Sequence, residues 1–205
     1  MGLAIVVTSL AWISFGLLHS WLASRAARRW MQTLVGPAER LVYNGIALVH
    51  LALVLGISAA AFVGQPGFDL PASLRLLLHG LQLVGVAGAL LALREYDLGR
   101  FTGWKQWRAG AADDLDASHE ALVIGGLHDY VRHPLYSASI LLLLASATTP
   151  LALATALFAS AYFIIGLRFE EARLLRLYGE AYSNYCAATP ALLPHWPRHR
   201  PSPPK

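Results

Sequence analysis

One long apolar stretch decides the fold: Leu135 to Leu167, LYSASILLLLASATTPLALATALFASAYFIIGL, which has no charged residue. A helix that crosses a membrane needs about 20 apolar residues. The stretch is therefore long enough for two helices, and Thr148-Thr149-Pro150 divides it. Its first half is about 22 Å long at 1.5 Å per residue, which is shorter than a hydrocarbon core of about 30 Å. The stretch predicts a short helical hairpin that is tilted or partly submerged.

Three further apolar stretches precede the hairpin, at Leu3 to Ala23, Leu41 to Val63 and Leu74 to Leu93. The first is longer than the roughly 7 to 15 residues of a signal-peptide core and predicts a retained span. The chain of 205 residues is 56% hydrophobic and 14% charged, whereas about 25% of residues are charged in soluble domains. We therefore predict an all-α, polytopic membrane protein with about five transmembrane helices. One domain is expected over residues 1–194, followed by a Pro-rich tail at 195–205.

The basic residues lie almost entirely on one side of these predicted spans. Fifteen of the sixteen Lys and Arg residues fall on that side, and Arg75 is the exception. The positive-inside rule makes this side cytoplasmic, with the N-terminus outside and a C-terminal helix inside. We expect the bilayer as partner, the inner membrane if the source is bacterial, and no nucleic acid. The single cysteine, Cys186, excludes internal disulfides, thiolate zinc sites and iron–sulfur clusters.

A first candidate motif lies at the mouth of the hairpin, in the stretch LVIGGLHDYVRHPLY from Leu122 to Tyr136. Pro134 suits the first turn of a helix, and the free N–H groups of such a turn favour an anion. Arg132 and His133 add cationic donors. The motif predicts a site for a carboxylate on an apolar ligand, and the alternative is an interfacial anchor.

A second candidate motif follows the hairpin, in the stretch RFEEARLLRLYGEAYSNYCAATPALLP. It places Glu170 and Glu171 at the membrane interface, where ionisable groups need a partner or a function. On a helix, one of these carboxylates can face inward while the other is paired. Tyr182 and Tyr185, three residues apart, belong to a following turn and either line a site or anchor in the interface.

Together the motifs resemble the integral membrane methyltransferases related to isoprenylcysteine carboxyl methyltransferase. The first pattern is matched by Leu122, Val123, Gly126, Arg132, His133, Pro134 and Tyr136, with His128 in place of the family's tyrosine. The second is matched by Glu170, Glu171, Leu174, Tyr178, Gly179, Tyr182 and Tyr185. LLHSWLASRAARRW with VYN at 42–44, and YDLGRFTGWKQW at 96–107, are similar to the NnrU and methanethiol S-methyltransferase branch.

This resemblance implies S-adenosylmethionine as cofactor and a small thiol or lipophilic molecule as methyl acceptor, with methanethiol favoured. Methyl transfer from a sulfonium is an in-line displacement that mainly requires positioning. Arg132, His133 and Glu170 are the expected catalytic residues: Glu170 for the cofactor's ammonium group, and Arg132 or backbone N–H groups near His133 for its carboxylate. His128 or His133 would accept a thiol proton. The residues expected to bind the cofactor are Leu122, Val123, Gly126, His128, Arg132, His133, Pro134, Leu135, Tyr136, Glu170 and Glu171.

The acceptor side and the competing functions are less constrained. The residues expected near the acceptor are His19, Tyr43, Asn44, Arg168, Tyr182 and Tyr185. Gly166 stands where the prenylcysteine enzymes have a substrate arginine, which argues against that acceptor. The alternatives are an isoprenylcysteine carboxyl or phospholipid amine methyltransferase, an NnrU-like accessory protein and a haem protein. The intramembrane His19, His50 and His79 would lie at depths of about 6, 14 and 21 Å, so no metal site is expected.

Overall fold

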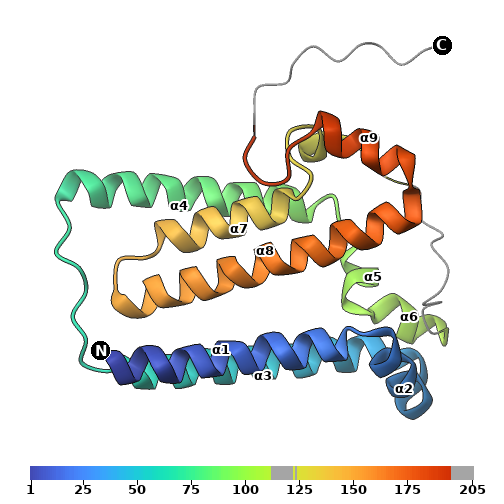
Figure 1. Cartoon of the computed structure of the whole chain (residues 1–205), viewed down its shortest axis with the longest axis horizontal. Helices are drawn as coiled ribbons and strands as arrows, with labels where there is room; N and C mark the ends of the chain where they lie inside the picture. Colours follow the sequence, from blue (N-terminus) through green and yellow to red (C-terminus); the bar gives the residue numbers. More distant parts are fainter. Residues whose placement is uncertain (112–121, 123, 195–205) are drawn as a thin grey trace.

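The computed structural model describes residues 1–111, 122 and 124–194, and these are helical with no strand (Figure 1). The helices are α1 (Gly2–Leu22), α2 (Arg25–Val35), η1 (Gly36–Ala38), α3 (Glu39–Ala61), α4 (Ala72–Leu93), α5 (Leu98–Thr102), α6 (Trp104–Ala109), η2 (Gly126–Asp129), α7 (Pro134–Ala145), α8 (Pro150–Tyr178) and α9 (Glu180–Ala188). The prediction of an all-α protein is confirmed. Val123 and the predicted tail lie outside the described residues.

Within the part of the chain that the structure describes, four helical stretches are long and apolar enough to cross a membrane: α1, α2 with α3, α4, and α8. The prediction that both hairpin helices are short was wrong for α8, which has 29 residues and is about 43 Å long at 1.5 Å per residue. It continues past Leu167 because the following Glu, Arg and Leu residues are good helix formers. The helix ends at Gly179, whose φ of 54° is in the left-handed region.

The other hairpin helix, α7, has 12 residues and is about 18 Å long, too short to cross the membrane by itself. It packs on α4 at two glycines. A Cβ atom on Gly85 would lie 2.9 Å from the Cβ atom of Leu142, and one on Gly88 would lie 3.2 Å from that of Ala138. Such small residues let two helix backbones approach closely inside a membrane. The close approach to α4 therefore holds the short helix in place.

The long helices form two groups that meet along α8. Figure 1 shows α1 and α3 side by side, and α4 and α7 on the other side of α8. The core between α1, α3 and α8 includes Trp12, Phe15, Val54 and Ala159. The Trp12 ring stacks on Phe158 with centroids 6.4 Å apart. This packing fixes α8 as the shared central helix.

The short helices α2, α5, α6 and α9 gather at the end of the molecule remote from the N-terminus (Figure 1). At this end the Arg28 side chain donates to the buried Glu39 carboxylate at 2.8 and 2.9 Å, which ties α2 to the start of α3. α7 begins at the same end, and α8 finishes there. Both candidate motifs therefore lie at one end of the molecule.

Candidate active site

A cavity of about 540 Å³ lies at this end, within the range of about 300–1,000 Å³ that is usual for small-ligand sites. It is bounded by the residues that follow α4, by the segment that leads into α7, and by α8 and α9. The lining residues are Glu95, Tyr96, Leu122, Gly125, Gly126, His128, Arg132, His133, Glu170, Leu174, Tyr178, Tyr182 and Tyr185. The two sequence motifs thus share one cavity.

Arg132 joins the two motifs. Its Nε atom donates to Glu171 Oε1 at 2.8 Å, and its Nη1 atom donates to the carbonyl oxygens of Cys186 and Thr189. The side chains are only 10% exposed for Arg132 and 18% for Glu171. Because most of its donors are engaged in this way, the guanidinium clamps α8 and α9 beside α7.

The main chain reinforces this clamp. The N–H group of Arg132 donates to the Pro190 carbonyl at 2.8 Å, and that of His133 donates to the Ala191 carbonyl at 3.1 Å. The expectation that backbone N–H groups near His133 hold a cofactor carboxylate is therefore not met by these two groups. Both are already used to fasten the segment after α9.

His133 lies between the two glutamates. Its Nε2 atom donates to Glu171 Oε1 at 3.2 Å, and its Nδ1 atom lies 3.7 Å from Glu170 Oε2. The Tyr136 ring stacks on the imidazole with centroids 5.5 Å apart, and its hydroxyl donates to Glu170 at 3.0 Å. Burial lowers the pKa of His133 although both carboxylates oppose this shift, so the ring is neutral at neutral pH.

The two glutamates differ in exposure. The Glu171 side chain is paired with Arg132, whereas the Glu170 side chain is 44% exposed and lines the cavity. A carboxylate in this position suits a cationic group of a ligand, and the tyrosine rings on the same wall suit a second one.

Glu95 is a site residue that sequence reasoning missed. Its Oε1 atom accepts the Leu127 N–H at 3.0 Å, and its Oε2 atom lies 3.4 Å from His128 Nε2. The neighbouring Tyr96 was missed as well; burial, followed by the charges of Glu170 and Glu95, raises the pKa of its hydroxyl. The available signal was an acidic residue directly after an apolar span, on the same side as both motifs.

Most of the predicted cofactor residues come together. Leu122, Gly126, His128, Arg132, His133 and Glu170 line the cavity. Pro134, Leu135 and Tyr136 form the first turn of α7 beside it. Gly125, Leu174 and Tyr178 also line the cavity but were not among the expected site residues.

The predicted acceptor residues divide into two sets. Tyr182 and Tyr185 line the cavity, whereas His19, Tyr43, Asn44 and Arg168 do not. The His19 ring is hydrogen-bonded to the Tyr43 hydroxyl between α1 and α3, and Arg168 is exposed on α8. The Asn44 amide donates to the carbonyl oxygens of Phe101 and Thr102, which ties α3 to α5. α1 and α3 pack on α8 away from the cavity, so their polar residues stay outside it.

Two of the intramembrane histidines, His19 and His50, have local partners. His50 Nε2 lies 3.2 Å from the Ser14 hydroxyl, and His79 is exposed on α4. Among the residues that the structure describes, no three His, Cys, Asp or Glu side chains gather so that they can hold a metal ion.

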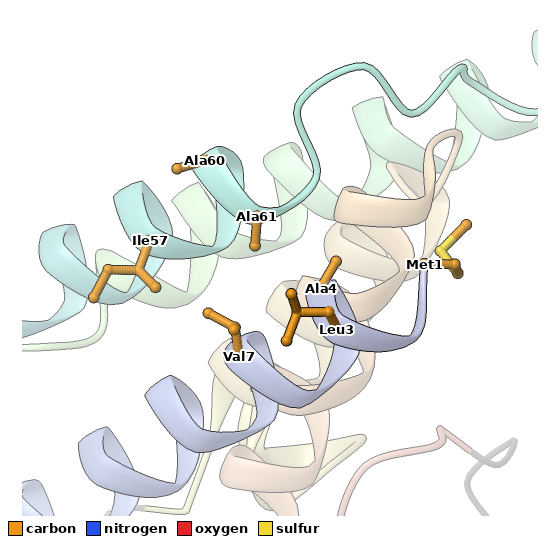
Figure 2. A pocket seen from close by; sticks show the side chains of 7 residues that line it. All are labelled: Met1, Leu3, Ala4, Val7, Ile57, Ala60 and Ala61. Atoms are coloured by element: carbon orange, nitrogen blue, oxygen red, sulfur yellow. The ribbon is translucent and has the colours of Figure 1, made fainter.

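A second cavity, of about 420 Å³, lies between the start of α1 and the end of α3, remote from both motifs (Figure 2). It is lined by Met1, Leu3, Ala4, Val7, Ile57, Ala60 and Ala61. None of these side chains is ionisable, so this cavity offers no group for catalysis.

Comparisons with known proteins agree with the motifs. No family model and no solved structure matches the chain. It is 26% identical to the methanethiol S-methyltransferase of Pseudomonas deceptionensis, over 94% of this chain and 73% of that protein. It is 29% identical to methanethiol S-methyltransferase 2 of Bradyrhizobium diazoefficiens, over 95% of this chain and 74% of that protein. It is 28% identical to the methanethiol S-methyltransferase of Mycobacterium tuberculosis, over 98% of this chain and 81% of that protein. The chain is a distant homologue of the methanethiol S-methyltransferases.

Proposed function

We propose that this protein is a multi-pass membrane methyltransferase that uses S-adenosylmethionine to methylate a small thiol, with methanethiol as the leading acceptor. The observation that carries the proposal is the single cavity lined by Arg132, His133 and Glu170. Support also comes from relatives that share nearly the whole chain and are methanethiol S-methyltransferases.

The chemistry of the cavity fits the proposed cofactor. S-adenosylmethionine, when bound, supplies a methyl group activated on a positively charged sulfonium, and it also carries an ammonium and a carboxylate group. Glu170 would hold the ammonium, and the rings of Tyr96, Tyr178 and Tyr182, which line the cavity, would face the sulfonium through cation–π contacts. Arg132 Nη2 also donates to Glu171, and the second N–H of this nitrogen would face the carboxylate.

Proton removal from the acceptor is assigned to His133. A thiol attacks as its thiolate, so a base of the protein would have to accept the S–H proton. The Glu171 carboxylate accepts from Nε2, which leaves Nδ1 of the neutral ring as the atom that receives the proton. The new N–H would then lie beside Glu170 at the 3.7 Å separation already present.

We place the cavity at the cytoplasmic face, with the N-terminus outside and α9 inside, in the inner membrane if the source is bacterial. In this arrangement α7 is a fifth, short intramembrane helix within one domain over residues 1–194. Support comes from the basic residues at this end. Four exposed tryptophans also lie at this end, on the short helices or where α1 meets α2, as in an interfacial aromatic belt: Trp21, Trp30, Trp104 and Trp107.

The first test is calorimetric titration of the detergent-purified full chain with S-adenosylhomocysteine. We expect wild-type binding and at least about tenfold weaker binding for Glu170→Gln, because losing one charged contact of about 1.4 kcal/mol changes the affinity tenfold. Glu180→Gln, at the exposed start of α9, is the matched control and should bind as wild type. Addition of methanethiol with S-adenosylmethionine should then release dimethyl sulfide, detected by gas chromatography. A folded wild-type protein that binds no S-adenosylhomocysteine would overturn the proposal.

A further inference from the structure

A chain of polar contacts runs along one wall of the cavity, from the end of α4 to α9. Glu95 accepts the Leu127 N–H at 3.0 Å and lies 3.4 Å from His128 Nε2. The His128 Nδ1 atom donates to the Arg132 carbonyl at 3.1 Å, and the His128 carbonyl accepts from the Tyr185 hydroxyl at 2.6 Å. None of these contacts is used by the proposed chemistry.

The turn beside Glu95 is shaped around this carboxylate. Gly126 has a φ of 60°, in the left-handed region that favours glycine. A Cβ atom at this position would collide with the Glu95 carboxylate. Glycine at position 126 therefore leaves room for the carboxylate where it accepts the Leu127 N–H.

His128 is the link between the two ends of this wall. Its two ring nitrogens face a carboxylate and a backbone carbonyl, so one side chain contacts both. A tyrosine, which the family resemblance would lead one to expect here, has a single hydroxyl. Arg132, whose carbonyl His128 contacts, also clamps Glu171 and the end of α9. A change in the position of Glu95 would therefore also affect the α8 and α9 walls of the cavity, through His128 and Arg132.

We propose that Glu95 and His128 are positioning residues that set the affinity of the cavity for the cofactor, by holding the Gly125–Leu127 turn and, through Arg132, the α9 wall. This inference rests on the proposed function. The pair orders the binding site before the ligand arrives, and such preorganisation lowers the cost of binding. It leaves the methyl-transfer step itself to the residues around His133.

The test measures S-adenosylhomocysteine affinity by calorimetry for Glu95→Ala, His128→Phe and the double variant, with the melting temperature of each ligand-free protein. We expect about tenfold weaker binding in each single variant. The loss in the double variant should be no larger than in Glu95→Ala, because both single variants break the contact between Glu95 and His128. Glu95→Gln retains an oxygen for Leu127 and an amide for His128, so it should restore affinity to within about threefold. Asp97→Ala is the control, because the exposed Asp97 pairs with Lys105 outside the cavity.

Steady-state kinetics distinguish a loss of cofactor positioning from general damage to the fold. At saturating S-adenosylmethionine, kcat and the thiol KM of His128→Phe should stay within about twofold of wild type while the cofactor KM rises. His128→Phe keeps the bond from Leu127 to Glu95, so it carries the test if Glu95→Ala does not fold. Unchanged affinity in His128→Phe would overturn this inference alone. Absence of binding by folded wild-type protein would overturn the proposed function and this inference with it.

Discussion

At the scale of single residues, His133 is the side chain whose charge state matters most. Burial lowers its pKa, against the opposing effect of Glu170 and Glu171, from an ordinary value of about 6.5. The imidazole is therefore neutral above that pH and becomes protonated only as the pH falls through the lowered pKa. Because a general base works only in its neutral form, its contribution is present at neutral and alkaline pH and lost in acid.

The lowered pKa of His133 predicts a specific pH profile for the thiol reaction. In wild type, kcat/KM for methanethiol should be constant from about pH 6.5 up to the pKa of the thiol, since the neutral enzyme deprotonates the neutral thiol. In His133→Gln the rate should instead rise about tenfold per pH unit, because it depends on thiolate formed in solution. Initial rates of dimethyl sulfide formation measure both profiles, with Glu180→Gln as control. A tenfold rise per unit in wild type would contradict the assignment of His133 as base.

At the scale of helices, the contact between α4 and α7 has a tight steric requirement. α7 is too short to cross the membrane, and Gln82 Nε2 donates to the carbonyl of its last residue, Ala145, at 3.1 Å. Gly85 faces Leu142 about one turn away along the same interface. Since α7 starts at the cavity, the position of this interface determines where His133 lies.

Gly85→Ala should therefore lower the melting temperature in detergent. The added Cβ would lie 2.9 Å from the Leu142 Cβ and 3.0 Å from its backbone, and such overpacking costs about 1–3 kcal/mol. Gly80→Ala, on the same helix with no atom within 4 Å of its Cβ position, is the matched control. It should be neutral or stabilising by up to about 1 kcal/mol, because alanine is the better helix former. Equal shifts in the two variants would show that the α4–α7 contact is not close.

At the scale of the whole molecule, charge and cavity coincide at one end. The short helices α2, α5, α6 and α9 lie at the end that holds the cavity. The α3–α4 and α7–α8 connections lie at the other end (Figure 1). Arg75, in the first turn of α4 near the α3–α4 connection, donates to the Leu70 carbonyl at 3.0 Å. The proposed orientation of the protein therefore also places the cavity on the cytoplasmic side of the membrane.

Cys186 tests this orientation without any mutation, because it is the only cysteine of the chain and lies on α9. A membrane-impermeant maleimide should label it in inside-out vesicles and leave it unlabelled in right-side-out vesicles. Gln65→Cys in a Cys186→Ser background provides the control, since residue 65 is exposed in the α3–α4 connection and should show the opposite pattern. Labelling of Cys186 from the outside would reverse the proposed topology.

The sequence alone determined the membrane class, the spans at α1, α3 and α4, and the two motifs that form the cavity. These features depend on properties that are local along the chain: the length of an apolar run, a Pro at a helix start, and two adjacent carboxylates after a span. Helical spacing also turns the two neighbouring glutamates to different faces.

Only the tertiary structure decided which side chains share the cavity. It brought in Glu95 from the end of α4, engaged Arg132 with the carbonyls after α9, and kept His19 and Tyr43 in a separate contact between α1 and α3. It also continued α8 to Tyr178, past the end of the apolar run. The reason is physical: hydropathy and spacing describe one helix at a time, whereas the members of a cavity depend on how separate helices cross, rotate and approach one another.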